Sequence, residues 1–388
     1  MTLDPELSKL LGNISTLSSP AQLEVIQITQ KMISLGFIAH FQRLEEGPVV
    51  RTYFFEPFSS SPLNKIIGKE EDIALALKVE SLMLARARGE ISIAVPRGDR
   101  QLIRFDKCLM NLLQSPTVRG MTLPVLMGQT PIGEDFYMDL AEQPHLLIAG
   151  TTNSGKSIFT SQLICSLALL HEPSDLKFTL TDTKQLDLVF FEGLPHIQDV
   201  LTDIHGLRSK LLELLKIVEE RTRLMSGISR NVREWNSCGL GPPFPFHILV
   251  IDEFADVLGR DEEYIKSLHP KMRPQNIATL VKRLAQISRA AGVHIVIATQ
   301  RPSVEVVDGD IKTNFPARIC FKLPTMADSR VVLDENGAEK LLGKGDYLYK
   351  ISGSDSCKRA HSAFVSINDI AVIIQQADSL RRQYVQKG

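Results

Sequence analysis

The chain has 388 residues, a length that suggests two or three domains, because single hydrophobic cores stop growing at roughly 250 to 300 residues. Its hydrophobic fraction of 44%, charged fraction of 23% and net charge of −1 exclude a disordered or fibrous chain and a strong global attraction to nucleic acid. Any contact with DNA must therefore be local.

The five cysteines lie far apart and form no C-x-x-C pair, which argues against a zinc knuckle and a disulfide framework and favours a reducing compartment. His145, His196 and His294 lack the spacing of metal ligands, so we expect packed or capping histidines. Residues 1–20 lack a basic segment followed by an apolar one, and no run approaches the ~18 apolar residues of a membrane span. We expect a cytoplasmic protein without a membrane span.

The N-terminal part of the chain contains mixed signals. Apolar residues recur at helical spacing over residues 20–37, after a Ser-rich stretch at residues 15–19. Strand-like runs follow at residues 48–55, 90–96, 101–105 and 123–127, with a helical stretch at 70–88 among them. We interpret residues 1–45 as a helical extension and residues 46–140 as a small α+β domain.

After residue 140, short apolar runs alternate with helical segments, a pattern typical of a parallel sheet that is buried on both faces. The predicted strands are residues 145–149, 176–181, 246–251, 293–299 and 317–323, and the predicted helices are residues 157–170, 207–225 and 276–291. The sequence therefore predicts an α/β domain over residues 141–388.

A phosphate-binding loop follows the first of these strands. It consists of Gly150, Thr151, Thr152, Asn153, Ser154, Gly155, Lys156 and Ser157. Glycines let backbone N–H groups and the helix N-terminus face phosphates, Lys156 reaches the terminal phosphates and Ser157 holds Mg²⁺. The alternative is a coincidental Gly-rich turn, but the strand before the loop and the helix after it favour a site for ATP and Mg²⁺.

Two further strand ends carry polar residues. The strand at 246–251 ends in Asp252, which would hold the Mg²⁺ shell, and Glu253, which would act as general base for the attacking water. The strand at 293–299 ends in Gln300, our candidate sensor of the γ-phosphate. The alternatives are an acidic pair that faces solvent and a solvated strand end.

With these residues in place, the chain resembles the motor domains of FtsK/SpoIIIE-type DNA translocases from about residue 47 to near its C-terminus. The resemblance rests on residues 144–157, 192–196, 283–286, 289–292, 298–304, 328–330 and 339–346. It implies a RecA-like P-loop NTPase domain beside the smaller domain, and ATP hydrolysis coupled to translocation. It also implies a homo-hexameric ring around double-stranded DNA, with nucleotide sites between subunits.

The resemblance further implies an arginine finger from a neighbouring subunit. Arg289 is the candidate and Arg283 the reserve, while a solvated basic helix face is the alternative. Helical spacing predicts a core-facing set and an opposite face that holds Lys282, Gln286 and Arg289. The core-facing set is Ile277, Leu280, Val281, Leu284 and Ile287.

By the same resemblance, Arg301, Lys312 and Arg330 occupy DNA-contacting positions, where they would bind phosphates with little sequence information. Ordinary surface charges are the alternative for each. The chain departs from the family at Met326, where a lysine is usual, and over residues 259–276, which we interpret as an exposed insertion.

The family's winged-helix domain would follow Gly388, and we therefore expect a stand-alone motor that takes its direction from a separate loading or orienting protein. One rival is a polypeptide-export or conjugative coupling ATPase on the same motor fold, which would usually carry tandem motor domains or membrane spans. The other is a non-motor switch in which ATP only drives assembly, although the presence of Glu253 argues against it.

Overall fold

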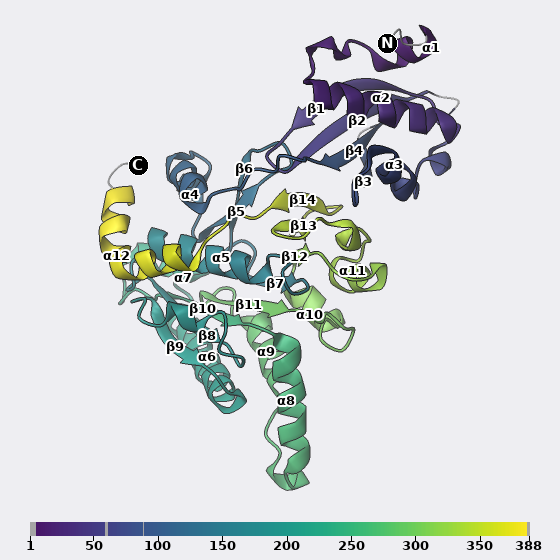
Figure 1. Cartoon of the computed structure of the whole chain (residues 1–388). Coiled ribbons are helices and arrows are strands. Elements are labelled where there is room, and N and C mark those ends of the chain that lie inside the picture. Colours follow the sequence, from purple (N-terminus) through teal and green to yellow (C-terminus); the bar gives the residue numbers. More distant parts are fainter. Residues whose placement is uncertain (1–4, 59–60, 88, 386–388) are drawn as a thin grey trace. The chain divides into compact units, whose positions relative to one another are not determined.

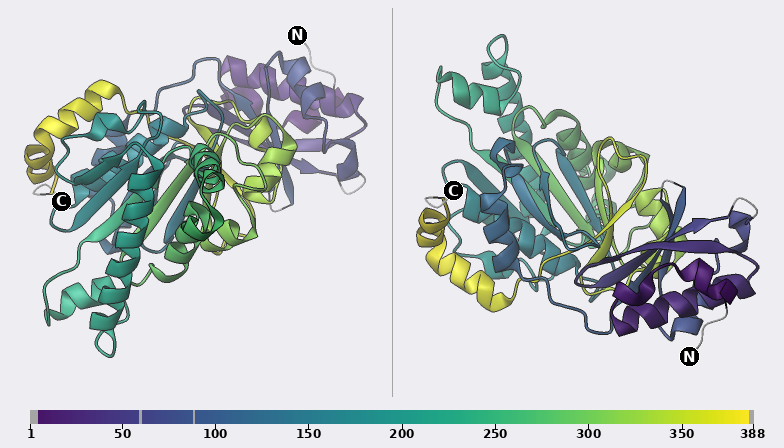
Figure 2. Two further views of the ribbon diagram at one scale, coloured as in Figure 1. Left: turned by 90° about the horizontal axis from the view of Figure 1, so that it is seen from below. Right: turned by 90° about the horizontal axis from the view of Figure 1, so that it is seen from above.

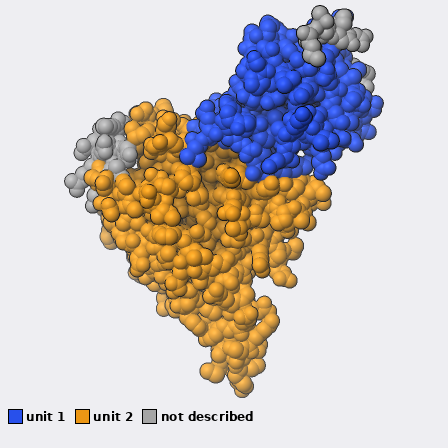
Figure 3. Space-filling view, viewed as in Figure 1, with its two compact units in different colours: residues 1–102, 129–134, 340–342 blue, residues 103–128, 135–339, 343–388 orange. Residues whose placement is uncertain are grey.

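The computed structural model describes residues 5–58, 61–87 and 89–385, which form two compact units (Figure 3). Unit 1 comprises residues 1–102, 129–134 and 340–342, and unit 2 comprises residues 103–128, 135–339 and 343–388. These units do not follow the predicted division at residues 45/46 and 140/141. The first strand already begins at Ala39, and the segment after residue 102 packs within unit 2. The division into compact units does not define domain borders, so the borders at 45/46 and 140/141 stay a prediction.

Unit 1 is built on a four-stranded antiparallel sheet in the order β1-β2-β4-β3 (Figure 1). Its elements are α1 (Pro5–Leu11), α2 (Ser19–Ser34), β1 (Ala39–Glu46), β2 (Val50–Pro57), α3 (Glu70–Leu77), β3 (Met83–Ala87) and β4 (Glu90–Pro96). Val25, Ile28 and Met32 recur at helical spacing on α2 and are buried. They share one core with alternate residues of β4, Ile91 and Ile93, as the period of two in a strand requires.

Two predictions near this unit are wrong. The helix predicted over residues 70–88 ends at Leu77, where Lys78 adopts a left-handed conformation, and residues 83–87 pair with β4 as β3; residue 88 lies outside the described residues. The strand predicted over residues 101–105 is instead the approach to helix α4 (Phe105–Gln114). The apolar face of α4 (Phe105, Cys108, Leu109 and Leu112) packs in unit 2, so tertiary burial overrides the local strand pattern.

Unit 2 contains a ten-stranded sheet in the order β6-β5-β14-β13-β12-β7-β11-β10-β8-β9. The strands are β5 (Pro124–Gln129), β6 (Asp135–Asp139), β7 (His145–Ala149), β8 (Leu176–Thr181), β9 (Ile197–Leu201), β10 (Phe246–Ile251), β11 (Val293–Thr299), β12 (Ala317–Phe321), β13 (Asp346–Lys350) and β14 (Lys358–His361). The block from β12 to β9 is parallel throughout, whereas β13 and β14 run antiparallel. The predicted α/β fold is confirmed.

Helices cover both faces of this sheet (Figure 2). The described helices of this unit are α4, α5 (Lys156–Leu170), α6 (Ile204–Met225), α7 (Val232–Cys238), α8 (Phe254–Ser267), α9 (Ile277–Ile287), α10 (Gly309–Asn314), α11 (Met326–Leu333) and α12 (Ile367–Val385). α12 packs on α5, and α6 packs on α9. The connection from β7 to β8, which contains α5, runs across the sheet toward β9, whereas the connections from β9 to β10 and from β10 to β11 run back toward β7. Right-handed crossovers therefore place α5 and α6 on opposite faces.

The predicted strands at 145–149, 176–181, 246–251 and 293–299 match the observed bounds, and all four are almost wholly buried, as a doubly covered parallel sheet requires. Helix α9 is shorter than predicted, and Ile287, placed in the core by its spacing, is 41% exposed. No helix within the described ranges combines the length and apolarity that a bilayer crossing needs.

The segment at residues 259–276 is not simply an exposed insertion. Its first half continues α8, which runs to Ser267. Asp261 is buried there, where its carboxylate accepts a hydrogen bond from Arg208 on α6 and another from the backbone N–H of Ile277. The segment is therefore anchored to two neighbouring helices.

Candidate nucleotide site

The loop between β7 and α5 has the geometry that the P-loop motif predicts. Asn153 and Gly155 have positive φ values of 61° and 117°, and the helix begins at Lys156. The backbone N–H of Gly150 donates to the carbonyl of Thr299 at 3.2 Å, which ties the loop to the end of β11. Within the part of the chain that the structure describes, the N–H groups of Thr152, Asn153 and Gly155 have no acceptor. Such N–H groups at a helix N-terminus suit a phosphate.

A second segment packs against this loop and was not predicted as part of the site. The N–H of Gly345, which has a φ of 98°, donates to the carbonyl of Ser154 at 2.8 Å. A Cβ on Gly155 would stand 2.6 Å from the nitrogen of Gly345, so the close approach requires glycine. In the sequence, residues 339–346 contribute to the family resemblance and carry no signal of their own for a place at the nucleotide site.

Lys156 and Asp252 form a buried ion pair below the loop. Their side chains are 2% and 7% exposed, and Nζ of Lys156 donates to Oδ1 of Asp252. Burial raises the pKa of the Asp252 carboxyl, while the adjacent ammonium opposes that rise. The two residues come together because β7 and β10 are both parallel to β11, which lies between them, so their carboxyl ends share one edge of the sheet.

Ser157 sits one residue into α5, with its hydroxyl near the same edge. Its Oγ donates to Oδ2 of Asp187 at 2.7 Å. Asp187 was missed by sequence reasoning, although a signal existed, because acids that follow a parallel strand gather at the edge where Asp252 lies. The hydroxyl of Ser157 and the carboxylate of Asp252 are hard oxygen donors, and this chemistry fits Mg²⁺.

Glu253 and Gln300 are also brought to the loop. Glu253 has a φ of 52°, and its carboxylate accepts hydrogen bonds from the Thr299 hydroxyl at 3.2 Å and the Gln300 N–H at 3.1 Å. Lys184 lies 3.5 Å from its other oxygen. The side-chain oxygen of Gln300 accepts from the Thr152 hydroxyl at 3.0 Å. Gln300 therefore contacts the P-loop through its side chain and Glu253 through its backbone.

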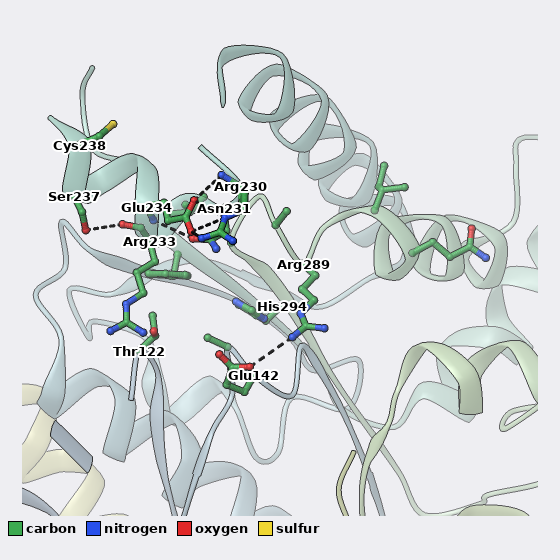
Figure 4. Close-up of a pocket in the computed structure, with 17 residues that line it drawn as sticks. Thr122, Glu142, Arg230, Asn231, Arg233, Glu234, Ser237, Cys238, Arg289 and His294 are labelled. Atoms are coloured by element: carbon green, nitrogen blue, oxygen red, sulfur yellow. Dashed lines mark hydrogen bonds and ion pairs between the residues drawn. The ribbon is translucent and has the colours of Figure 1, made fainter. Parts of the chain in front are cut away.

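Arg289 is not brought to this site. It lies in the turn before β11, at the opposite edge of the sheet, where its guanidinium is 3.6 Å from Glu142 and 61% exposed. Its surroundings form a cavity of about 930 Å³ that also contains Arg230 and Arg233 (Figure 4). The reserve candidate, Arg283, is also exposed and pairs with Glu219 at 3.2 Å.

Two of the predicted DNA-contacting residues form hydrogen bonds with other side chains of the same chain. Lys312 on α10 donates to Asp334 at 2.7 Å, and Arg330 on α11 donates to the side chain of Asn336 at 2.7 Å. Arg301 is exposed on the loop that follows the sensor position. Arg301 lies next to Gln300 in the chain, so this loop starts at the candidate nucleotide site.

The histidines that the sequence excluded as metal ligands are packed in unit 2. His145 and His294 are 1% exposed, and each ring donates an N–H to a backbone carbonyl, that of Ala285 and that of Pro144 respectively. Burial lowers the pKa of His145 to about 3 and that of His294 to about 4. Neutral histidines therefore belong to the core here.

Comparison with known proteins places this geometry in context. The profile described as FtsK/SpoIIIE family matches residues 110–304, and the FtsK alpha domain profile matches residues 13–97. The chain is 32% identical over 396 residues to the DNA translocase FtsK of Rickettsia typhi, which covers 92% of this chain and 51% of the relative. It is 34% identical over 344 residues to that of Helicobacter pylori, covering 86% and 39%. The chain thus spans about half the length of the curated relatives it matches, or less.

Solved structures agree on the fold. The conjugation coupling protein TcpA of pCW3, solved with ATPγS, superposes with a TM-score of 0.62 at 22% identity, covering 92% of this chain and 98% of that one. The cytoplasmic domain of the type VII secretion ATPase EccC from Thermomonospora curvata gives a TM-score of 0.59 at 23% identity, covering 71% and 34%. At these identities the likeness concerns the fold alone.

Proposed function

Because the chain belongs to the FtsK/SpoIIIE family, we propose that it is an ATP-driven motor that acts on double-stranded DNA. The observation that carries the proposal is the convergence of Lys156, Asp252, Glu253 and Gln300 at one edge of a parallel sheet, around a loop with N–H groups that have no acceptor among the described residues. This arrangement suits a nucleoside triphosphate, since ligands of such sheets bind at the carboxyl ends of the strands. The DNA substrate is inferred from the relatives, which are DNA translocases.

In the proposed site, the triphosphate would take the Lys156 ammonium from Asp252. Asp252 and Ser157 would then hold Mg²⁺, whose charge offsets that of the β- and γ-phosphates. Glu253 would accept a proton from the attacking water, and for this its carboxylate must turn from Thr299 toward the loop. Gln300, bonded to the P-loop and followed by Arg301, would transmit the loss of the γ-phosphate to the next loop.

The position of Arg289 supports a shared active site. β11 has seven residues, so Arg289 stands ~20 Å or more from Gln300 at about 3.3 Å per residue. An arginine side chain cannot bridge that distance. Arg289 can therefore act only on the nucleotide of another copy, and we propose that copies of the chain form a ring of six in which each supplies Arg289 to its neighbour.

The DNA would be held by phosphate contacts from Arg301, Lys312 and Arg330. Lys312 would have to exchange Asp334 for a phosphate, and Arg330 would have to release Asn336. These exchanges make the DNA affinity of each contact smaller than that of a free cation. A ring repeats each residue in every subunit, so weak individual contacts suffice for a grip that falls steeply with salt.

The test is ATP turnover of the purified chain with and without linear duplex DNA at low salt. We expect duplex to raise turnover several-fold, with Lys156→Ala inactive and Arg301→Ala responding less to DNA at unchanged basal turnover. Basal turnover that no duplex stimulates would favour the export or coupling alternative. Nucleotide-dependent assembly without turnover would favour the assembly switch. Displacement of a third strand from duplex DNA would separate translocation from mere binding.

A further inference from the structure

We propose that Asp187 is a positioning residue for the metal-binding hydroxyl of Ser157, an assignment that rests on the proposed nucleotide site. Asp187 lies in the connection that follows β8, far from both sequence motifs of the site. Its carboxylate nevertheless accepts the Ser157 hydroxyl proton at 2.7 Å. This contact joins the connection after β8 to the second residue of α5.

The connection that carries Asp187 is held in place independently of the Asp187 carboxylate. Asp182 follows β8 immediately, is 1% exposed, and accepts backbone N–H groups from five successive residues of the connection. These donors are Lys184 at 3.2 Å, Gln185 at 2.8 Å, Leu186 at 3.0 Å, Asp187 at 2.9 Å and Leu188 at 2.9 Å. A carboxylate that collects so many N–H groups fixes the loop backbone, so Asp187 is presented to Ser157 by a preformed turn.

The sheet explains why this turn reaches the site. β8 is parallel to β10, with Thr181 beside Ile251, so the residues that follow both strands emerge at the same edge. Thr183 donates to Asp256 at 2.8 Å, which joins the turn to the start of α8 directly after Glu253. Asp182 and Asp252 are therefore counterparts on adjacent strands, one that shapes a loop and one that faces the P-loop lysine.

The chemistry of a hydroxyl gives Asp187 its role. Serine has one O–H proton and two lone pairs. When the proton is donated to Asp187, the lone pairs of Oγ remain available for a cation. The carboxylate also makes Oγ a better electron-pair donor to a metal ion. Partners that orient a ligand in this way typically contribute 10- to 100-fold to metal affinity.

The alternative is that Asp187 only helps the connection to fold. The two roles differ in their consequences, because Asp182 holds the backbone and the Asp187 side chain bonds Ser157. Loss of the Asp187 carboxylate should leave the loop folded and weaken Mg²⁺ binding. The effect should also disappear when Ser157 has no hydroxyl to orient.

The experiment is a double-mutant cycle of Asp187→Ala and Ser157→Ala on the full chain, with binding of a fluorescent ADP analogue as readout. Mg²⁺ is titrated at fixed nucleotide, and affinity is also measured in EDTA. We expect Asp187→Ala to raise the Mg²⁺ midpoint about 10- to 100-fold, with affinity in EDTA within about twofold of the parent. In the Ser157→Ala background, Asp187→Ala should shift the midpoint no further.

Glu192→Gln, at an exposed position of the same connection, is the matched control and should leave the midpoint unchanged. Asp187→Asn keeps the size and an acceptor oxygen, so it should retain folding and give a smaller shift than alanine. An unchanged midpoint in Asp187→Ala, or an equal shift with and without the Ser157 hydroxyl, would overturn the inference. If the parent chain binds no nucleotide in Mg²⁺, the proposed function fails instead, so the two failures are distinguishable.

Discussion

The buried pair of Lys156 and Asp252 makes a prediction that can be tested without nucleotide. Both side chains are almost fully enclosed. Removal of one partner leaves an uncompensated charge, which typically costs about 3 to 5 kcal/mol in the free energy of unfolding. Lys156→Met removes the ammonium and keeps most of the aliphatic volume, so its effect on stability reports the charge rather than a cavity.

We therefore expect Lys156→Met to lower the thermal midpoint of the nucleotide-free protein by about 10 °C, taking ~2 to 4 °C per kcal/mol for a unit of this size. The double variant Lys156→Met with Asp252→Asn should recover most of the loss, because no charge then remains buried. Neither variant should hydrolyse ATP. Circular dichroism melts at neutral pH provide the measurement.

The pH dependence of the single variant tests whether the buried charge of Asp252 causes the loss of stability. Asp252 without its partner can escape the penalty only by binding a proton, so its folded pKa would lie above its unfolded one. The loss of stability should then be smaller at pH 5 than at pH 8.

Lys266→Met, which breaks an exposed pair with Glu262, is the control and should change stability by less than ~0.5 kcal/mol. A Lys156→Met midpoint within roughly 2 °C of the parent's, or a double variant less stable than the single, would refute the reasoning.

Three further predictions concern other parts of unit 2. Gly345→Ala should impair nucleotide binding, since its Cβ would meet Oγ of Ser362 at 2.7 Å on a backbone with φ of 98°, and normal mant-ADP affinity would contradict this. Burial lowers the folded pKa values of His145 and of His247, a buried residue of β10, to about 3. Stability that is present above pH ~6.5 should therefore fall by about 2 kcal/mol per histidine when the pH is lowered to 5, and equal denaturant midpoints at pH 5 and 7.5 would count against it. Arg289→Ala should bind nucleotide normally and lose about 10³-fold or more in ATP turnover. Mixing it with Lys156→Ala should restore activity if Arg289 acts between copies, because some interfaces then combine an intact P-loop with an intact Arg289. Inactive mixed assemblies would argue against a shared site.

Much of the central sheet could be worked out from the amino-acid pattern. β7, β8, β10 and β11 were predicted to the residue, because each is a continuous apolar run that ends abruptly in polar residues. The P-loop was recognisable for a similar reason, since its glycines, lysine and serine lie within one short stretch. The family was also predicted from these local motifs and is confirmed by the profile match, whereas ATP hydrolysis by this chain is a proposal.

Other features depended on contacts between residues far apart in the chain. The ion pair of Lys156 with Asp252, the approach of Gly345 to the loop and the contact of Asp187 with Ser157 all join different connections of the sheet. β3 was mistaken for helix because pairing with β4 outweighs its local preference.

The position of Arg289 shows most clearly what the sequence predicts and what only the tertiary structure decides. Its place before the strand at 293–299 was readable, but only the parallel sheet puts it at the edge opposite the P-loop. Local motifs record which chemical groups a chain carries, because those groups are neighbours along the backbone. Which groups meet is decided by strand order and direction, since these place distant strand ends at one edge of the sheet or keep them a strand length apart.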